Sequence, residues 1–243
     1  MHKISIPARV IESVKARRGT EHPHAGLDPS RTALIVIDLQ NGFMMDDVAH
    51  SLCTTAREIV PNVNRLASAV RGSGGRVFWV QNTHDDSCLE TWSNLHEMTS
   101  REQTEKRVAS MSQGTLGHQI WHKLDVQPED EKVLKYRYSA FLPGASDLAQ
   151  RLRAANLDTV IITGTVTNVC CESSARDAMM TNFKTIMVTD GNAANSDEEH
   201  NASLINFYLT FGDIVSTDEL IGWLRQNACQ GLNSAPAAAA AAL

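Results

Sequence analysis

The sequence predicts an α/β protein of three-layer α/β/α type, with a six-stranded, mostly parallel sheet between two layers of helices. Short apolar runs that end in polar or turn residues recur along the chain, as buried parallel strands do. Segments with helical periodicity lie between these runs, which indicates βαβ units. The chain has 243 residues, of which 42% are hydrophobic and 21% charged, so one large domain can bury a sizeable core.

The apolar runs give the predicted strands and the periodic segments give the predicted helices. In chain order the strands are Ala33–Ile37, Val77–Val80, Lys132–Leu134, Val160–Ile162, Thr185–Val188 and Asp213–Val215. The helices are Ala56–Val70, Ala145–Ala154, Val169–Met180 and Glu198–Leu209. Right-handed crossovers place the carboxyl ends of all parallel strands at one edge of the sheet, where ligands bind in open α/β folds.

Composition along the chain divides it into three parts. We predict an N-terminal extension over residues 1–30 with a short helix around Val10–Ala16, an α/β domain over 31–228, and a C-terminal tail over 229–243. The tail ends in a run of alanines that resembles an engineered remnant. Residues 84–114 form a polar insertion after a predicted strand, either a lid or a partly helical excursion on the surface.

Charge and cysteine content exclude several classes of protein. The net charge is −6 and the basic residues are scattered, which argues against nucleic acid or an anionic membrane as partner. No secretory signal and no apolar run of about 20 residues is present, so we expect a cytoplasmic protein. Five cysteines without a CxxC pair predict neither a disulfide framework nor a structural zinc site of the usual spacing.

Three polar residues follow or close three different predicted strands. Cys170 falls in the first turn of a predicted helix, where free N–H groups and the helix dipole favour a thiolate and can hold an oxyanion. Asp38 and Lys135 each close a strand. Taken one at a time, Cys170 is typical of a buried core cysteine, Asp38 of a turn aspartate and Lys135 of a surface lysine. If all three meet at one edge of the sheet, they supply the nucleophile, the proton acceptor and the cation, respectively, for amide hydrolysis through a thioester.

Three motifs in the expected order carry a family resemblance. They read Asp38-Leu39-Gln40-Asn41-Gly42-Phe43, then Lys135 shortly before Ser139-Ala140-Phe141, then Gly164-Thr165-Val166-Thr167-Asn168-Val169-Cys170. From about Thr32 to Trp223 the chain resembles the isochorismatase-like cysteine hydrolase superfamily. The resemblance implies that fold, a catalytic Cys-Asp-Lys triad, no cofactor, and a homo-oligomer, either a dimer or a tetramer. It also implies a cis peptide between Thr165 and Val166, which aims the N–H groups of Val166 and Cys170 at the oxyanion.

The second cysteine and the histidines call for separate interpretations. Motif spacing selects Cys170, so we expect the adjacent Cys171 to pack inward as a small hydrophobe. Metal-bearing relatives carry an Asp-x-His pair after the second strand, whereas this chain has Asn82-Thr83-His84. His118 and His122 have a spacing that would place them on one helix face, without the glutamate of a zinc-protease motif. We therefore predict no metal.

The expected substrate is a small carbamoyl or ureido compound. Segments 137–139 and 168–173 resemble the ureidoacrylate and biuret hydrolase branch. Candidate substrate-binding residues are Gln40, Phe43, Phe141 and Asn206, although both phenylalanines can equally be core and Asn206 a solvated helix residue. An amidase for another small amide of the maleamate or nicotinamide type, a vinyl-ether hydrolase, and a non-enzymatic interaction module remain alternatives.

Overall fold

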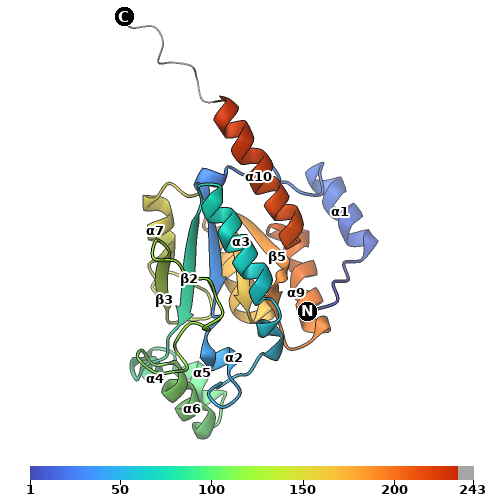
Figure 1. The fold of residues 1–243 in the computed structure, drawn as a ribbon. Helices are drawn as coiled ribbons and strands as arrows, with labels where there is room; N and C mark the ends of the chain where they lie inside the picture. Colours follow the sequence, from blue (N-terminus) through green and yellow to red (C-terminus); the bar gives the residue numbers. More distant parts are fainter. Residues whose placement is uncertain (235–243) are drawn as a thin grey trace, which may run out of the picture.

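A computed structural model describes residues 1–234, and its centre is a six-stranded sheet with all neighbouring strands parallel (Figure 1). The strands are β1 (Thr32–Ile37), β2 (Arg76–Asn82), β3 (Glu131–Lys135), β4 (Thr159–Thr165), β5 (Lys184–Ala193) and β6 (Asp213–Val215). Their order is β3-β2-β1-β4-β5-β6, so the winding direction reverses between β1 and β4. A reversal of this kind opens a crevice at the carboxyl ends of the two strands.

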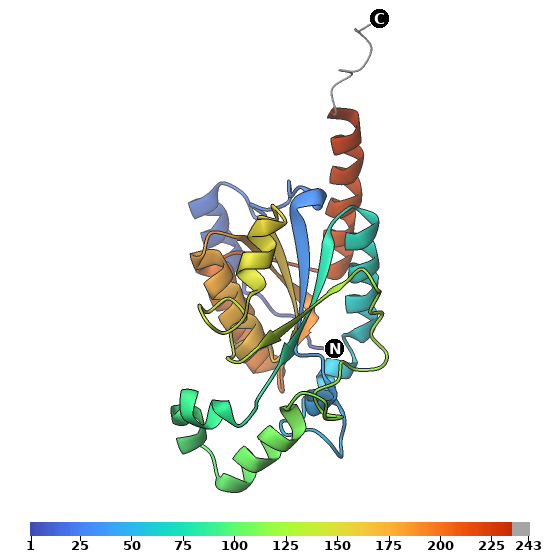
Figure 2. The ribbon, with the colours of Figure 1, turned by 90° about the vertical axis from the view of Figure 1, so that its left-hand side faces the viewer.

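Helices cover both faces of the sheet, and the three layers are visible in Figure 2. One face carries α3 (Val60–Gly72) and α10 (Thr217–Ser234), and the other carries α7 (Leu148–Ala154), α8 (Glu172–Met180) and α9 (Asp197–Thr210). Strand β1 is buried on both sides because its side chains alternate between the layers. Leu34 and Val36 belong to the core under α3, whereas Ala33, Ile35 and Ile37 belong to the core under α8 and α9.

The N-terminal segment adds one helix outside these layers. Helix α1 (Ala8–Arg18) packs against α9 through Val10 and Val14, which are four residues apart and lie on one face. It ends at Gly19, whose φ of 73° is left-handed and whose N–H bonds to the Lys15 carbonyl. The helix that the sequence predicts around Val10–Ala16 is therefore present and longer at both ends.

The predicted three-layer fold is confirmed, and each predicted strand overlaps an observed one. Helix boundaries were less accurate: α3 begins at Val60 rather than Ala56, because Pro61 occupies its first turn and a separate 3-10 turn (Thr54–Arg57) precedes it. Helix α10 runs past residue 229, where the tail was predicted to begin. The alanine-rich end of that tail, residues 235–243, lies outside the described residues.

The insertion after β2 is helical. It contains α4 (Ser87–Thr91), α5 (Ser93–Glu97) and α6 (Arg101–Met111), and it projects beyond the carboxyl edge of the sheet (Figure 2). The short α2 (Asn41–Met44) follows β1 at the same edge. None of the helices in residues 1–234 combines the length and the apolar character that a membrane crossing needs.

Candidate active site

The structure brings Asp38, Lys135 and Cys170 together at the carboxyl edge of the sheet. Asp38 directly follows β1, Lys135 ends β3, and Cys170 lies in the turn η3 (Thr167–Cys171) after β4. The Lys135 Nζ atom is 2.8 Å from Oδ2 of Asp38, and both side chains are 0% exposed. Cys170 is 3% exposed, and its thiol interacts with both partners. An acid, a cation and a thiol thus share one buried position at the reversal between β1 and β4.

A glycine lets β4 approach β1 at this position. Gly164 has a φ of 125°, and a Cβ atom there would lie 2.0 Å from the Ile37 carbonyl oxygen. Any other residue would therefore push apart the two strands that carry Asp38 and Cys170. Asp38 itself has a left-handed φ of 57°, with its N–H bonded to the Val80 carbonyl at 3.0 Å. This conformation turns the chain at the end of the strand.

The turn that carries Cys170 is built around one carbonyl group. The peptide bond between Thr165 and Val166 is cis, as the resemblance implied. The Val166 carbonyl accepts hydrogen bonds from the N–H groups of Val169 at 3.0 Å and Cys171 at 3.3 Å. The second bond spans five residues, which makes η3 a π-type turn, and α8 begins only at Glu172. Cys170 therefore lies two residues before the α-helix begins, rather than in its first turn as predicted.

A buried histidine supports this turn from α9. His200 Nε2 is 2.9 Å from the Thr189 carbonyl, so Nε2 carries the hydrogen and Nδ1 accepts one from the Thr167 hydroxyl at 2.8 Å. Burial lowers the pKa of His200 to about 4, which keeps the ring neutral and the arrangement fixed. The ring of His2 stacks on it with centroids 4.4 Å apart. His200 cannot be recognised from the sequence, because its only signal there is a place within a predicted helix.

Burial and the neighbouring charges shift the pKa values of the three site residues in opposite directions. Burial raises the pKa of Asp38, although the Lys135 ammonium acts in the opposite direction. Burial alone would lower the pKa of Lys135, but Asp38 and Cys170 together raise it, so the ammonium stays charged. Burial also raises the pKa of the Cys170 thiol, which Lys135 offsets only in part. The expectation that the helix start lowers the pKa of the thiol is therefore wrong: desolvation is the largest effect on that pKa and raises it.

Two of the predicted substrate-binding residues hold the scaffold instead. The Gln40 amide donates to the carbonyls of Asn82 at 3.1 Å and His118 at 2.9 Å, and its oxygen accepts from the Asn82 N–H at 2.8 Å. Its polar groups are thus engaged in tying β2 to the loop after β1. The Phe141 ring packs edge-on against Phe183, just before the start of β5. Phe141 is therefore a core residue near the opposite, amino-terminal edge of the sheet.

The other two candidates lie in different surroundings. Asn206 lies on the exposed face of α9, whereas His200, Ser203 and Phe207 form its buried face. Asn206 is therefore not brought to Cys170. Phe43 is buried in α2 and its ring lies edge-on to His50, with centroids 4.8 Å apart. Cys171 is fully buried in the core beneath α8, as expected.

The histidines singled out in the sequence lie in different settings. Residues 118–122 form turns rather than a helix, so His118 and His122 do not share a helix face. Backbone hydrogen bonds hold these turns, for example from the Trp121 N–H to the Leu39 carbonyl. His118 is buried, 2.9 Å from the Thr83 hydroxyl. His84 is buried beside the site and its ring stacks on Trp92. Burial lowers the pKa of His84 to about 3, so this ring is also neutral.

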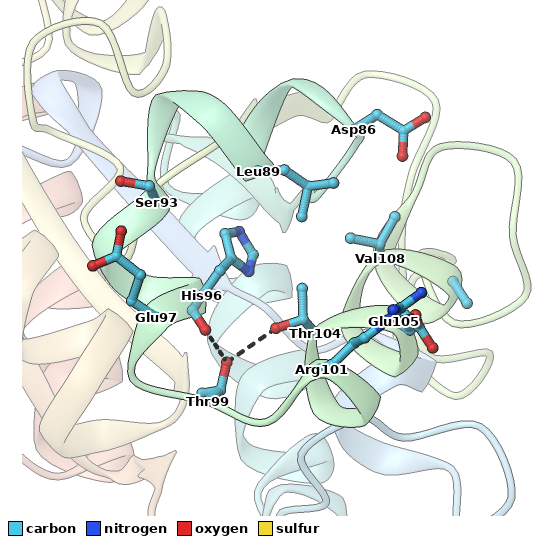
Figure 3. Close-up of a pocket in the computed structure, with 11 residues that line it drawn as sticks. Asp86, Leu89, Ser93, His96, Glu97, Thr99, Arg101, Thr104, Glu105 and Val108 are labelled. Atoms are coloured by element: carbon cyan, nitrogen blue, oxygen red, sulfur yellow. Dashed lines mark hydrogen bonds and ion pairs between the residues drawn. The ribbon is translucent and has the colours of Figure 1, made fainter.

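Helices α4, α5 and α6 enclose a separate hollow of about 870 Å³ (Figure 3). Leu89 and Val108 face each other across it, and the Thr99 hydroxyl bonds to that of Thr104 at 3.1 Å. Asp38, Lys135 and Cys170 do not line it. Its inner wall includes His96, whose ring centroid is 6.4 Å from that of His84. The hollow thus lies outside the buried site, with the two histidine rings between them.

Comparison with known proteins gives a consistent assignment. The family model named Isochorismatase domain matches residues 32–219. A cysteine hydrolase from Pseudomonas syringae pv. phaseolicola is 27% identical with a TM-score of 0.74, covering 83% of this chain and 96% of its own. N-carbamoylsarcosine amidase from Thermoplasma acidophilum is 25% identical with a TM-score of 0.61, covering 77% and 97%.

A third solved structure shows likeness of fold alone. The nicotinamidase/pyrazinamidase from Bacillus subtilis is 22% identical with a TM-score of 0.64, covering 76% of this chain and 99% of its own. The predicted superfamily and the predicted hydrolase class are confirmed by these matches. With the family model spanning most of the sheet and its helices, the chain belongs to the isochorismatase family of hydrolases.

Proposed function

We propose that the chain hydrolyses a C–N bond of a small carbamoyl or ureido compound through a thioester on Cys170. The observation that carries the proposal is the fully buried ion pair of Lys135 and Asp38 beside that thiol. A buried ion pair is weak support for stability but is suited to moving a proton at a reacting centre. The likeness to N-carbamoylsarcosine amidase supports the carbamoyl part of the proposal.

The first half of the reaction forms the thioester. Because the resting thiol is protonated, Asp38 takes its proton as the sulfur attacks the carbonyl carbon. The carbonyl electron pair moves to oxygen, and we assign the N–H groups of Val166 and Cys170 as donors to that oxyanion. Lys135 stabilises the negative charge that passes between thiol and carboxylate. As the intermediate collapses, the C–N bond breaks and the Asp38 proton goes to the leaving nitrogen, which departs as ammonia or an amine.

The second half releases the acid. Asp38, now a carboxylate again, takes a proton from a water molecule whose oxygen attacks the thioester carbon. The C–S bond then breaks, and the proton returns from Asp38 to the Cys170 sulfur. The products are the carboxylic or carbamic acid and the free thiol. This scheme uses the same two residues in both halves.

A carbamoyl substrate also requires hydrogen-bond acceptors, because N–H groups flank its carbonyl on both sides. Asn82 ends β2 next to Asp38, and its buried Oδ1 has no hydrogen-bond partner among residues 1–234. A buried acceptor left unpaired costs about 1–3 kcal/mol, so a substrate N–H that meets it is favoured over a group that cannot donate. We therefore assign Asn82 as a substrate-binding residue in place of Gln40.

The proposal is tested by a panel of small amides assayed for ammonia release. We expect ureido acids or biuret to exceed nicotinamide and maleamate at least tenfold in kcat/KM, which requires only about 1.4 kcal/mol of differential transition-state stabilisation. If nicotinamide or maleamate is cleaved best, the ureido assignment is discarded while the hydrolase assignment stands. If none of these amides is cleaved, the mechanism itself is wrong.

A further inference from the structure

Arg107 is a cation near the site with one unpartnered nitrogen in the described part of the chain. Arg107 lies on α6, and its buried Nη1 atom has no hydrogen-bond partner among residues 1–234. Withdrawing a guanidinium nitrogen from water without a partner is unfavourable, and Arg is usually buried only when paired. Arg137 shows the contrast: it donates to the carbonyls of Tyr136 and Thr91 and covers the Trp92 ring, so it fastens α4 to the strand edge.

The face of α6 that carries Arg107 is turned toward the site. Arg107 is four residues before Met111 and three before Ser110, and both of these are buried. The Ser110 hydroxyl bonds to the Val48 carbonyl at 2.8 Å, in the loop after α2. The Met111 carbonyl accepts from the His84 N–H at 3.2 Å. Arg107 is not among the residues of α6 that line the outer hollow in Figure 3, although Thr104, one turn before it, is.

Three histidine rings and a tyrosine lie within electrostatic reach of Arg107. Its charge acts on His50, His84 and His96, whose pKa values are lowered chiefly by burial and then by Arg107. It also acts on Tyr138, whose pKa responds to Cys170 and Lys135 as well. The Nδ1 atoms of His50 and His84 also have no hydrogen-bond partner in the described part of the chain. Tyr138 and His84 are thus both within electrostatic reach of Arg107 and of the catalytic Lys135.

Within residues 1–234, Lys135 forms an ion pair with Asp38, whereas Arg107 forms an ion pair with no acidic side chain. We propose that Arg107 binds a carboxylate of the substrate, so that the enzyme takes ureido acids in preference to neutral ureido compounds. This inference rests on the proposed function. A guanidinium can grip a carboxylate through two parallel hydrogen bonds, which would hold the far end of the substrate while its carbonyl meets Cys170.

The test compares two probes that differ in one charge, 3-ureidopropionate and its methyl ester. Each is assayed with the wild type, Arg107→Met, Arg107→Lys and the control Arg101→Met, whose residue is exposed on the same helix and pairs with Glu105. For Arg107→Met we expect a loss of roughly ten- to a hundredfold in kcat/KM on the acid, mainly through KM, and less than about threefold on the ester. Arg107→Lys should recover part of the loss, and Arg101→Met should match the wild type.

The outcomes separate this inference from the proposed function. Equal losses on acid and ester, or none on the acid, would overturn the carboxylate role. Thermal unfolding of each variant identifies a loss that is merely structural. If the wild type cleaves maleamate but no ureido compound, the proposed function fails, and maleamate with its methyl ester becomes the pair that decides on Arg107. A wild type that prefers the neutral member of whichever pair it cleaves would also overturn the inference.

Discussion

Two opposing effects act on the proton of Cys170. The Lys135 charge favours the thiolate, whereas burial and the Asp38 carboxylate favour the thiol. Burial prevails, which favours a protonated thiol in the resting protein. In the proposed mechanism the nucleophile is generated when Asp38 accepts the proton, and a protonated resting cysteine is less open to oxidation than an exposed thiolate.

Exchange of either adjacent cysteine for alanine tests this assignment. Cys170→Ala should lose essentially all turnover, because the covalent step requires the sulfur. Cys171→Ala should keep most activity and lose about 1 kcal/mol of stability, since its side chain fills the core. Activity is measured by ammonia release, and intact-mass analysis should find the acyl adduct on Cys171→Ala but not on Cys170→Ala. Turnover that survives in Cys170→Ala would refute the thioester mechanism.

At the scale of elements, the apolar runs identify the strands because most of them are buried on both faces, and the weakest run belongs to the edge strand β3, where Lys132 is exposed. The insertion was harder to predict. Its helix α6 has polar residues around most of its circumference and buries only Ser110 and Met111, so it shows little amphipathic periodicity. Its position above the site is set by contacts with the loop after α2 and with His84, which lie far away in the sequence.

The residues near the site divide in the same way, into those that the local sequence pattern places and those that only tertiary contacts place. Asp38, Lys135 and Cys170 could be placed together because each stands at the carboxyl end of a recognisable strand or just after it. Arg107 and His200 could not, because only tertiary packing shows which helix face turns inward. A polar residue in a helix gives the same sequence pattern whether it is solvated or buried.

The close approach of β4 to β1 gives a prediction for Gly164. Gly164→Ala should be destabilised by more than about 3 kcal/mol and lose activity, because its Cβ would overlap the Ile37 carbonyl and displace the turn that carries Cys170. The matched control is Gly74→Ala: it has a φ of +88° but open space around the Cβ, so only the conformational penalty of about 1–2 kcal/mol applies. Denaturant unfolding measures both. Equal destabilisation would show that the strand contact is unimportant.

At the scale of the whole molecule, the start of the N-terminal segment contacts residues that support the active-site turn. His2 stacks on His200, bonds to Asp197 at 2.8 Å and accepts from the Ala194 N–H at 3.0 Å. His200 in turn holds Thr167 at the start of the turn with Cys170. The extension that precedes the α/β domain therefore packs against the supports of the active-site turn rather than against a remote surface.

This arrangement makes stability depend on pH through His200. Its folded pKa of about 4 lies below the ordinary value of 6.5, because burial and then the nearby His2 disfavour the charged ring more than Asp197 favours it. Between these two pH values the unfolded chain binds a proton that the folded chain does not, so folding stability falls as pH decreases from about 6.5 to 4. His84, with a folded pKa of about 3, acts in the same direction.

For His200→Asn we expect lower stability at every pH but a weaker pH dependence. Asparagine can still accept from Thr167 but does not titrate, so the drop in unfolding free energy between pH 7.5 and pH 5 should shrink by about 2 kcal/mol relative to wild type. Urea unfolding at the two pH values measures it. Other titrating groups, such as His22, whose pKa Asp213 raises, contribute equally to both proteins and cancel in the comparison. An unchanged drop in the variant would mean that His200 is already protonated, or free to titrate, in the folded enzyme.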